Sequence, residues 1–451
     1  MASNLLKTFE KIERGRKKCI AKANEVNYPL PEDASLENIA QCIDAQGHVS
    51  EYYDDFIAMM SRDASFLKDG ILRIPYTLEK IGPNACQQMS GLKGVIWPEN
   101  LKEIGTNAFN YCSSWEGVID IPNTVETIGA DAFSDIGKST NNITEVNIPS
   151  SVTSVGSSAF ESMTGVINFD ANITKIPNYC FRCGSTVTTG GAWYEEFNIS
   201  DERLAQITEI GNSAFSYERK LKKLPIGPNL TKIESYAFQY CEGVTEPVVI
   251  PNGCSLGNYV FAYARLMGGI TFEDGEKTSS ITDYAFDRTH VGVDDLVLPK
   301  SVNTLGTNVF GYIYKGYTPD GKTLERVKRV IIKHEGTLSM GASTFNTAYV
   351  TDAVIVHAKK ITYSNSNGRQ FYNMPVKAVV FWNLDDDTTL TTSAFTSSTC
   401  ITSSGEGIFV PDDLVDHYKA QAGWSSFKNY IKPLTSWSGY ADYKASLEVS
   451  E

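Results

Sequence analysis

The sequence predicts a repeat solenoid that is mainly β, with short helical turns between its strands. A nine-residue string recurs and ends each time on a phenylalanine, as LKEIGTNAF (Phe109), VETIGADAF (Phe133), VTSVGSSAF (Phe160), ITEIGNSAF (Phe215) and LTKIESYAF (Phe238). Most successive phenylalanines lie 21 to 27 residues apart, which is a solenoid period and far too long for a heptad. With 42% hydrophobic residues among its 451, the chain can also bury a large core.

The strand of each repeat is illustrated by Val118 to Pro122, where apolar and polar residues alternate. Ile119 and Ile121 are expected to point inward and Asp120 outward, because side chains alternate along a strand. Pro122 has no N–H and therefore ends the hydrogen-bonded ladder.

The second half of the repeat returns the chain to the core through Val125 and Ile128. Gly129 is expected to allow a positive φ at the corner, Ala132 to let the backbone approach closely, and Phe133 to fill the interior. These roles recur wherever the string recurs.

Looser copies extend the repeat to about 13 coils within residues 49–406. They end at Phe181, Phe261, Phe286, Phe310, Phe345, Phe371 and Phe395, and Cys86 holds the same position in the first coil. A single coil cannot bury its apolar face alone, so we expect one curved stack with the phenylalanines on an interior line.

The repeat resembles the BspA-like leucine-rich repeats over about residues 70 to 400. The residues that carry the resemblance are I-P, then V or L, then I-G, then A-F and C. The resemblance continues into the tail as far as residue 434. It implies a right-handed solenoid of short parallel strands. It also links the chain to surface proteins of gut and oral bacteria, their phages and some mucosal parasites.

Residues 407–451 are expected to close the solenoid as a cap and tail. They resemble the short strand and helix that often close chains of this family. Asp412 or Asp413 can cap a helix that Gly423 would end. The apolar residues expected in this cap are Leu414, Val415 and Tyr418 on the helix and Trp424, Phe427 and Ile431 over the last coil.

Residues 1–48 do not fit the repeat and predict a separate helical attachment module. One apolar face is formed by Leu5, Leu6, Phe9 and Ile12. Pro29 and Pro31 then precede a second short helix. This start resembles those of some phage virion proteins, which implies attachment to a virion partner.

Charge and composition exclude several classes. The net charge of −13 disfavours nucleic acid as a partner, because neutralising phosphates requires excess Lys and Arg. No run of about 18 apolar residues predicts a membrane span, and the N-terminus does not predict a secretory signal. The nine cysteines are odd in number and sparse, which predicts reduced, buried thiols.

No string in the sequence predicts catalysis, so we expect a protein that is not an enzyme and needs no cofactor. Cys180 and Cys183 are spaced like a redox or zinc pair, but no second pair follows and packing is favoured. The adjacent acids Asp385, Asp386 and Asp387 lack the spacing of a calcium loop, so we predict a solvated turn and no metal site.

Two insertions in the repeat are the first candidates for ligand recognition, because insertions in a solenoid loop out from one edge. They span residues 185–202 and 311–326 and are rich in Gly, Thr and aromatics. The candidate residues are Trp193, Tyr194, Phe197, Tyr312, Tyr314 and Tyr317. The alternative is that these rings fold back and cover the edges of the coils.

The outward row of the strands is a second candidate surface. It turns apolar late in the chain, at Val249, Val297, Ile331 and Ile355. Such a row favours a partner or another copy of the chain, for which the expectation is a trimer as in fibres. The alternative is that β-branched residues stand there only because they suit strands.

Together these features predict a non-enzymatic binding protein attached through residues 1–48. The expected setting is a phage particle, as a fibre or decoration protein that contacts a surface glycan or protein of the host. The alternative is an adhesin on a bacterial cell surface.

Overall fold

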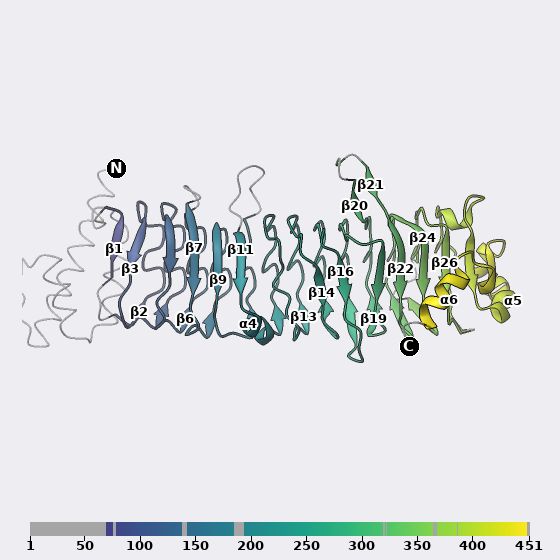
Figure 1. Cartoon of the computed structure of the whole chain (residues 1–451), viewed down its shortest axis with the longest axis horizontal. Helices are drawn as coiled ribbons and strands as arrows, with labels where there is room; N and C mark the ends of the chain where they lie inside the picture. The colour runs from purple at the N-terminus through teal and green to yellow at the C-terminus, as the bar shows by residue number, and fades with distance from the viewer. Residues whose placement is uncertain are drawn as a thin grey trace, which may run out of the picture. The chain divides into compact units, whose positions relative to one another are not determined.

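The structure is a computed structural model that describes most of the chain beyond residue 68 (Figure 1). The described ranges are 69–74, 78–137, 142–184, 194–318, 321, 323–363, 368–385 and 387–448. The predicted attachment residues Leu5, Leu6, Phe9 and Ile12 lie outside them. Two compact units divide after Gln206, and we call them the N-terminal and C-terminal units.

In the N-terminal unit, most described coils give one strand to each of two rows. The elements are β1 (Ile71–Arg73), β2 (Lys80–Ile81), β3 (Gly94–Ile96), β4 (Glu103–Ile104), β5 (Gly117–Asp120), β6 (Thr127–Ile128), β7 (Ile143–Ile148), β8 (Ser154–Val155), β9 (Gly165–Phe169), β10 (Lys175–Ile176), β11 (Tyr194–Ile199) and α4 (Asp201–Gln206). Parallel pairing follows the orders β1-β3, β5-β7-β9-β11 and β2-β4-β6-β8.

The C-terminal unit continues the same plan. Its strands are β12 (Glu209–Ile210), β13 (Lys232–Ile233), β14 (Val248–Ile250), β15 (Ser255–Leu256), β16 (Ile270–Phe272), β17 (Ser279–Ile281), β18 (Asp295–Leu298), β19 (Val302–Leu305), β20 (Gly316–Tyr317), β21 (Leu324–Glu325), β22 (Val327–Ile332), β23 (Thr337–Met340), β24 (Val350–Val356), β25 (Lys360–Tyr363), β26 (Ala378–Phe381), β27 (Gly407–Val410) and β28 (Ile431–Pro433). Its helices are η2 (Thr399–Ile401), η3 (Asp412–Leu414), α5 (Val415–Ala420), η4 (Trp424–Phe427), η5 (Leu434–Ser436) and α6 (Tyr440–Glu448).

The rows of the C-terminal unit are parallel, in the orders β12-β13-β15-β17-β19-β23-β25, β14-β16 and β18-β22-β24-β26-β27-β28. The hairpin β20–β21 is antiparallel and stands apart from these rows. The predicted solenoid of short parallel strands is therefore confirmed.

A stack of phenylalanines forms the centre of each unit. In the N-terminal unit the rings of Phe109, Phe133, Phe160 and Phe181 follow one another at 5.5 to 5.6 Å and are fully buried. In the C-terminal unit the stack runs from Phe215 to Phe395 with ring centroids 4.9 to 5.9 Å apart. The predicted interior line of aromatics is thus present in each unit.

The alternation predicted for the strand is also confirmed. Ile119 and Ile121 are buried at 1% and 3% exposure, whereas Asp120 is exposed. Val125 and Ile128 are buried as well, so the repeat directs both halves of each coil into the core.

The conformation predicted for Gly129 is wrong. Its φ is not positive, and the positive values in this coil belong to Asp131 (53°) and Asp135 (56°) instead. A Cβ on Gly129 would lie 2.4 Å from the backbone nitrogen of Thr106. The glycine is therefore required because consecutive coils approach so closely there, not because of its own backbone angle.

The C-terminal cap is confirmed in part. Trp424, Phe427 and Ile431 are buried, and β27 and β28 extend the last parallel sheet. The predicted aspartate cap is wrong, because α5 begins after Leu414 with no side-chain cap. Asp412 instead accepts a hydrogen bond from the backbone N–H of Thr435 at 3.0 Å.

Helix α6 was not predicted, and it covers part of the outward row. Ile331 and Ile355 are 6% and 0% exposed and pack in a cluster with Trp437 and Tyr443. The prediction that these two residues face a separate partner is therefore wrong, because the chain's own tail occupies the position. Val297 packs at the edge of the same cluster, whereas Val249 is 44% exposed.

The close approach at Gly129 predicts that Gly129→Ala destabilises the N-terminal unit by roughly 2 to 3 kcal/mol, because the new Cβ meets backbone that cannot move aside. Chemical denaturation of the full chain measures this loss. Gly94→Ala is the matched control, since its Cβ would meet only the end of the Ile71 side chain, at 3.3 Å. Equal losses in the two variants would contradict the assigned role.

The docking of α6 predicts a loss of stability on acidification. His357 is buried, lies 2.7 Å from the Tyr443 hydroxyl, and has its pKa lowered to about 4 by burial and by Lys333. The unfolded histidine binds a proton near pH 6.5 while the folded one does not, so stability falls as pH drops below 6.5. This histidine alone should cost about 2 kcal/mol between pH 7.5 and 5.

His357→Phe should remove the loss of about 2 kcal/mol that this histidine causes on acidification. Denaturant unfolding at pH 7.5 and at pH 5 measures the loss. Tyr443→Phe is the control, because it removes the hydrogen bond but keeps the titrating ring. The assignment is wrong if both variants lose as much stability as the parent on acidification.

Candidate functional site

In most coils two backbone positions, two residues before and two residues after the core phenylalanine, adopt a left-handed conformation. Around Phe238 they are Tyr236 (φ 62°) and Tyr240 (φ 58°). Asn, Asp and Gly suit this conformation best, and other residues adopt it at a cost of roughly 1–2 kcal/mol. The N-terminal unit holds Asn107, Asp131 and Asp135 there, so the backbone does not require tyrosine.

The positions two residues after the phenylalanine form a row on the surface of the C-terminal unit. We call it the Tyr/Arg row, and it consists of Tyr217, Tyr240, Tyr263, Arg288 and Tyr312. The first three rings stack at 4.7 and 4.6 Å. The Arg288 guanidinium continues the stack, at 5.2 Å from the ring of Tyr263 and 5.0 Å from that of Tyr312.

A second row lies alongside, four residues after each phenylalanine. This mixed row consists of Arg219, Glu242, Arg265, His290, Tyr314 and Tyr349. Glu242 pairs with Arg219 at 3.3 Å and with Arg265 at 3.4 Å. Isolated parallel bridges join Arg265 to His290 and His290 to Tyr314, so neighbouring coils are in register here as well.

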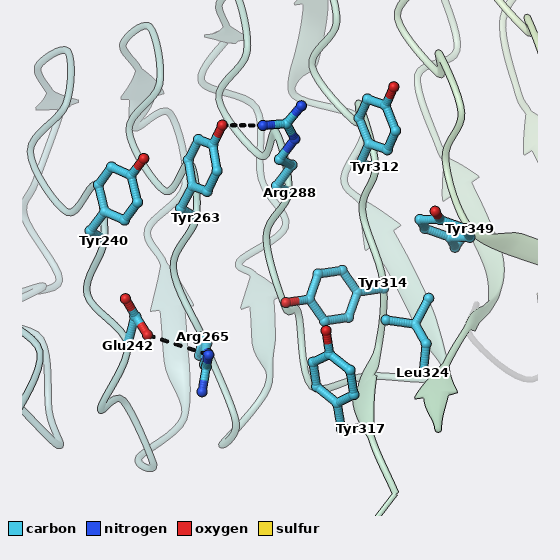
Figure 2. Close-up of a pocket in the computed structure, with 10 residues that line it drawn as sticks. All are labelled: Tyr240, Glu242, Tyr263, Arg265, Arg288, Tyr312, Tyr314, Tyr317, Leu324 and Tyr349. Atoms are coloured by element: carbon cyan, nitrogen blue, oxygen red, sulfur yellow. Dashed lines mark hydrogen bonds and ion pairs between the residues drawn. The ribbon is translucent and has the colours of Figure 1, made fainter. Parts of the chain in front are cut away.

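An open groove of about 350 Å³ lies between the two rows. Figure 2 shows Tyr240, Tyr263, Arg288 and Tyr312 on one side and Glu242, Arg265 and Tyr314 on the other. The hairpin β20–β21 adds Tyr317 and Leu324 at one end. Both walls are thus built from positions that the repeat places at regular intervals.

Arg265 and Arg288 are the positively charged hydrogen-bond donors of the groove. Burial, and to a smaller extent the charge of Arg265, lowers the pKa of His290 to about 4, so this ring is neutral near pH 7. Burial also raises the pKa of Tyr314, which keeps its hydroxyl protonated. Arg265 and Arg288 therefore supply positive charge from opposite walls.

Of the predicted recognition residues that the structure describes, three line one groove and two pack against the coils. Tyr312, Tyr314 and Tyr317 come together in the groove. Tyr194 does not, because it is fully buried and its hydroxyl donates to the carbonyl of Phe160. Phe197 stacks on Phe169 at 5.5 Å within β11, which pairs with β9.

In the described part of the predicted recognition insertion 185–202, the alternative of folding back holds, because residues 194–202 belong to the added strand β11 and the start of the short helix α4. Residues 185–193, which include Trp193, lie outside the described residues.

Several groove residues were not predicted: Tyr240, Glu242, Tyr263, Arg265, Arg288 and Tyr349. Their signal is present in the sequence as FQYCE, FAYAR, FDRTH, FGYIY and FNTAY, once each core phenylalanine is aligned. Aligning the positions that vary between repeats, as well as those that recur, would have identified the groove.

Other chemistry is not supported within the described ranges. Seven cysteines there are free and buried, and burial raises the pKa of the Cys180 thiol. No group of acids, histidines and cysteines there is arranged to hold a metal ion, and Asp387 pairs with Lys360. Among the helices that the structure describes, none is long and apolar enough to cross a membrane.

The chain belongs to the BspA type leucine rich repeat family. The family profile matches six copies over residues 70–188 and 191–315, more than half of the chain, and confirms the resemblance seen in the repeat. A comparison with curated protein sequences gives no significant match.

Solved structures with a similar fold include a leucine-rich repeat protein from Bacteroides ovatus, at 18% identity and a TM-score of 0.47 over 80% of this chain and 82% of that one. The pneumococcal vaccine antigen PcpA matches at 16% identity and a TM-score of 0.36, over 70% of this chain and 87% of that one. A leucine rich cell surface protein from Faecalibacterium prausnitzii matches at 18% identity and a TM-score of 0.32, over 70% of this chain and 86% of that one.

The burial of Tyr194 predicts a structural role that stability measurements can test. Tyr194→Phe should destabilise the chain by about 1 kcal/mol, because the hydrogen bond to the Phe160 carbonyl is lost. Tyr111→Phe, at a ring that is 47% exposed, should change stability by less than about 0.5 kcal/mol. A Tyr194 variant as stable as the parent would contradict this role.

Proposed function

We propose that the chain is a non-enzymatic binding protein of a bacterial surface that holds its ligand in the groove between the Tyr/Arg row and the mixed row. The tyrosines of the Tyr/Arg row carry this proposal. They stack on successive coils, and Tyr240, Tyr263 and Tyr312 line the groove together with Arg288.

The chemistry of the groove suits recognition. Tyrosine offers a large, rigid and amphipathic contact area at low cost in conformational entropy, which is why binding surfaces use it. The rows stand on coils held by the phenylalanine stack, so their side chains are positioned before a ligand arrives.

The same groove does not suit catalysis. The histidine of the adjoining mixed row, His290, does not line the groove, is stacked on Tyr314 at 5.4 Å and has a pKa lowered to about 4 by burial and by Arg265. The carboxylate of the groove, Glu242, is held between Arg219 and Arg265. A stacked histidine with a lowered pKa and a carboxylate already paired with two arginines support binding without chemical change.

Family membership supports a bacterial surface as the setting, because repeats of this class are linked to surface proteins. The phage-particle prediction depends on residues 1–48, which lie outside the described residues. Their role as an attachment module is part of the proposal. The predicted trimer loses two of its proposed contacts, because α6 covers Ile331 and Ile355.

Binding of the full chain to immobilised gastric mucin, measured by surface plasmon resonance, tests the role of the groove. The double variant Tyr240→Asn and Tyr263→Asn should bind at least tenfold more weakly, because asparagine keeps the backbone conformation but removes the phenol. Tyr236→Asn with Tyr259→Asn is the matched control, since these rings stack at 5.1 Å on the same coils outside the groove. Equal effects of the two double variants would rule out the groove as the binding site.

Fractionation tests the setting separately. Antibody against the chain should label washed bacterial cells in a culture that holds no phage particles. Recovery of the chain only in purified virions would place it on a phage instead.

A further inference from the structure

The geometry points to an extended acidic polysaccharide as the ligand of the groove, a chain of sugar rings that carries carboxylates and lies across the coils. This inference rests on the proposed function and names the class of ligand. It depends on three features of the groove: its repeat distance, the occupied faces of its rings, and the arginines on its two walls.

The repeat distance favours a periodic ligand. Tyr240 and Tyr263 present equivalent hydroxyls on successive coils, with ring centroids 4.6 Å apart. Side chains on the same face of an extended peptide recur about every 6.6 Å, which does not match this spacing. Successive rings of an extended polysaccharide advance by a distance close to the coil spacing, so each sugar can meet the same group.

The rings of the Tyr/Arg row have little free face. Tyr240 lies between Tyr217 and Tyr263, and Tyr263 lies between Tyr240 and Arg288. Nucleic-acid bases bind single-strand proteins by stacking on open aromatic faces, and the rings of this row have none to offer between Tyr217 and Arg288. What the row offers is hydroxyls and ring edges, which suit the hydroxyl groups of sugars.

Arg288 provides the charge that selects an acidic sugar. Its guanidinium is exposed, is held between the rings of Tyr263 and Tyr312, and donates one hydrogen bond to the Tyr263 hydroxyl. Among the described residues it forms no ion pair, and the carboxylate that acts on it electrostatically is the half-buried Asp287 of the same coil. A guanidinium has five N–H donors in a plane, so donors remain for a carboxylate.

Arg265 supports the same conclusion from the mixed row. One of its terminal nitrogens lies 3.4 Å from Glu242, a carboxylate that also pairs with Arg219. Two arginines thus share one glutamate, which leaves the mixed row with one excess positive charge near the groove. Carboxylates spaced along a polysaccharide can pair with Arg288 and Arg265 together.

Isothermal titration calorimetry of the full chain with polygalacturonate oligosaccharides tests the inference. The acidic form should bind at least tenfold more tightly than the same oligosaccharides after complete methyl esterification, and added salt should weaken binding of the acidic form. Equal affinity for the two forms would overturn the assignment of an acidic ligand.

Arg288→Met should reduce binding of the acidic form at least tenfold, because methionine keeps an apolar stem between the tyrosines but removes the charge. Arg369→Met is the matched control, since Arg369 lies 4.9 Å from the ring of Tyr372, also in a left-handed conformation, outside the groove. Unchanged binding by Arg288→Met, or an equal loss in both variants, would count against the inference.

The outcome separates the ligand class from the proposed function. Alginate and hyaluronan extend the panel of acidic polysaccharides, and poly-glutamate tests an acidic peptide. If none of the polysaccharides binds at millimolar concentration, or poly-glutamate binds more tightly than all of them, the polysaccharide assignment fails. Loss of mucin binding in the Tyr240 and Tyr263 double variant would still uphold the groove as a binding site.

Discussion

Stacking of one buried phenylalanine per coil is the constraint on which the rest of the structure depends. Rings at about 5.5 Å, as at Phe133 and Phe160, fix how closely one coil can follow the next. That distance brings the strands into parallel pairing and presses the backbone together at glycines such as Gly129. It also places equivalent surface positions of successive coils next to one another, so any residue type repeated at one position forms a row.

The groove depends on two departures from this regularity. Tyrosine and arginine replace small polar residues at left-handed positions, where neighbouring rings offset the backbone cost by stacking at 4.6 to 4.7 Å. The insertion that forms β20–β21 then adds Tyr317 beside Tyr314, with ring centroids 5.6 Å apart. Regular coils supply the walls, and one irregular coil supplies the end.

The sequence was sufficient to predict the parts of the fold that recur. The inward Ile119 and Ile121, the phenylalanine stack and the buried Trp424 all follow from spacing and alternation. The role of Gly129 could not be deduced, because it depends on the distance to Thr106 in the preceding coil. The burial of Ile355 was also hidden, since it depends on where α6 packs.

The candidate site was predicted only where an insertion marked it. Tyr312, Tyr314 and Tyr317 were identified by the insertion, but Tyr194 was equally aromatic and is buried. Composition cannot distinguish a ring that returns to the core from one that lines a surface. The number of residues between a ring and the core phenylalanine of its coil makes that distinction, because each such position faces the same way in successive coils.

The Tyr/Arg row also has a definite end. Beyond Tyr312, the next two left-handed positions at this offset hold Thr347 and Asn373, which carry no ring. A ligand that extended further would meet short polar side chains instead of stacked phenols. If the row binds a chain as proposed, the number of consecutive coils that bear a ring, and not the depth of a pocket, would set the length of ligand in contact with it.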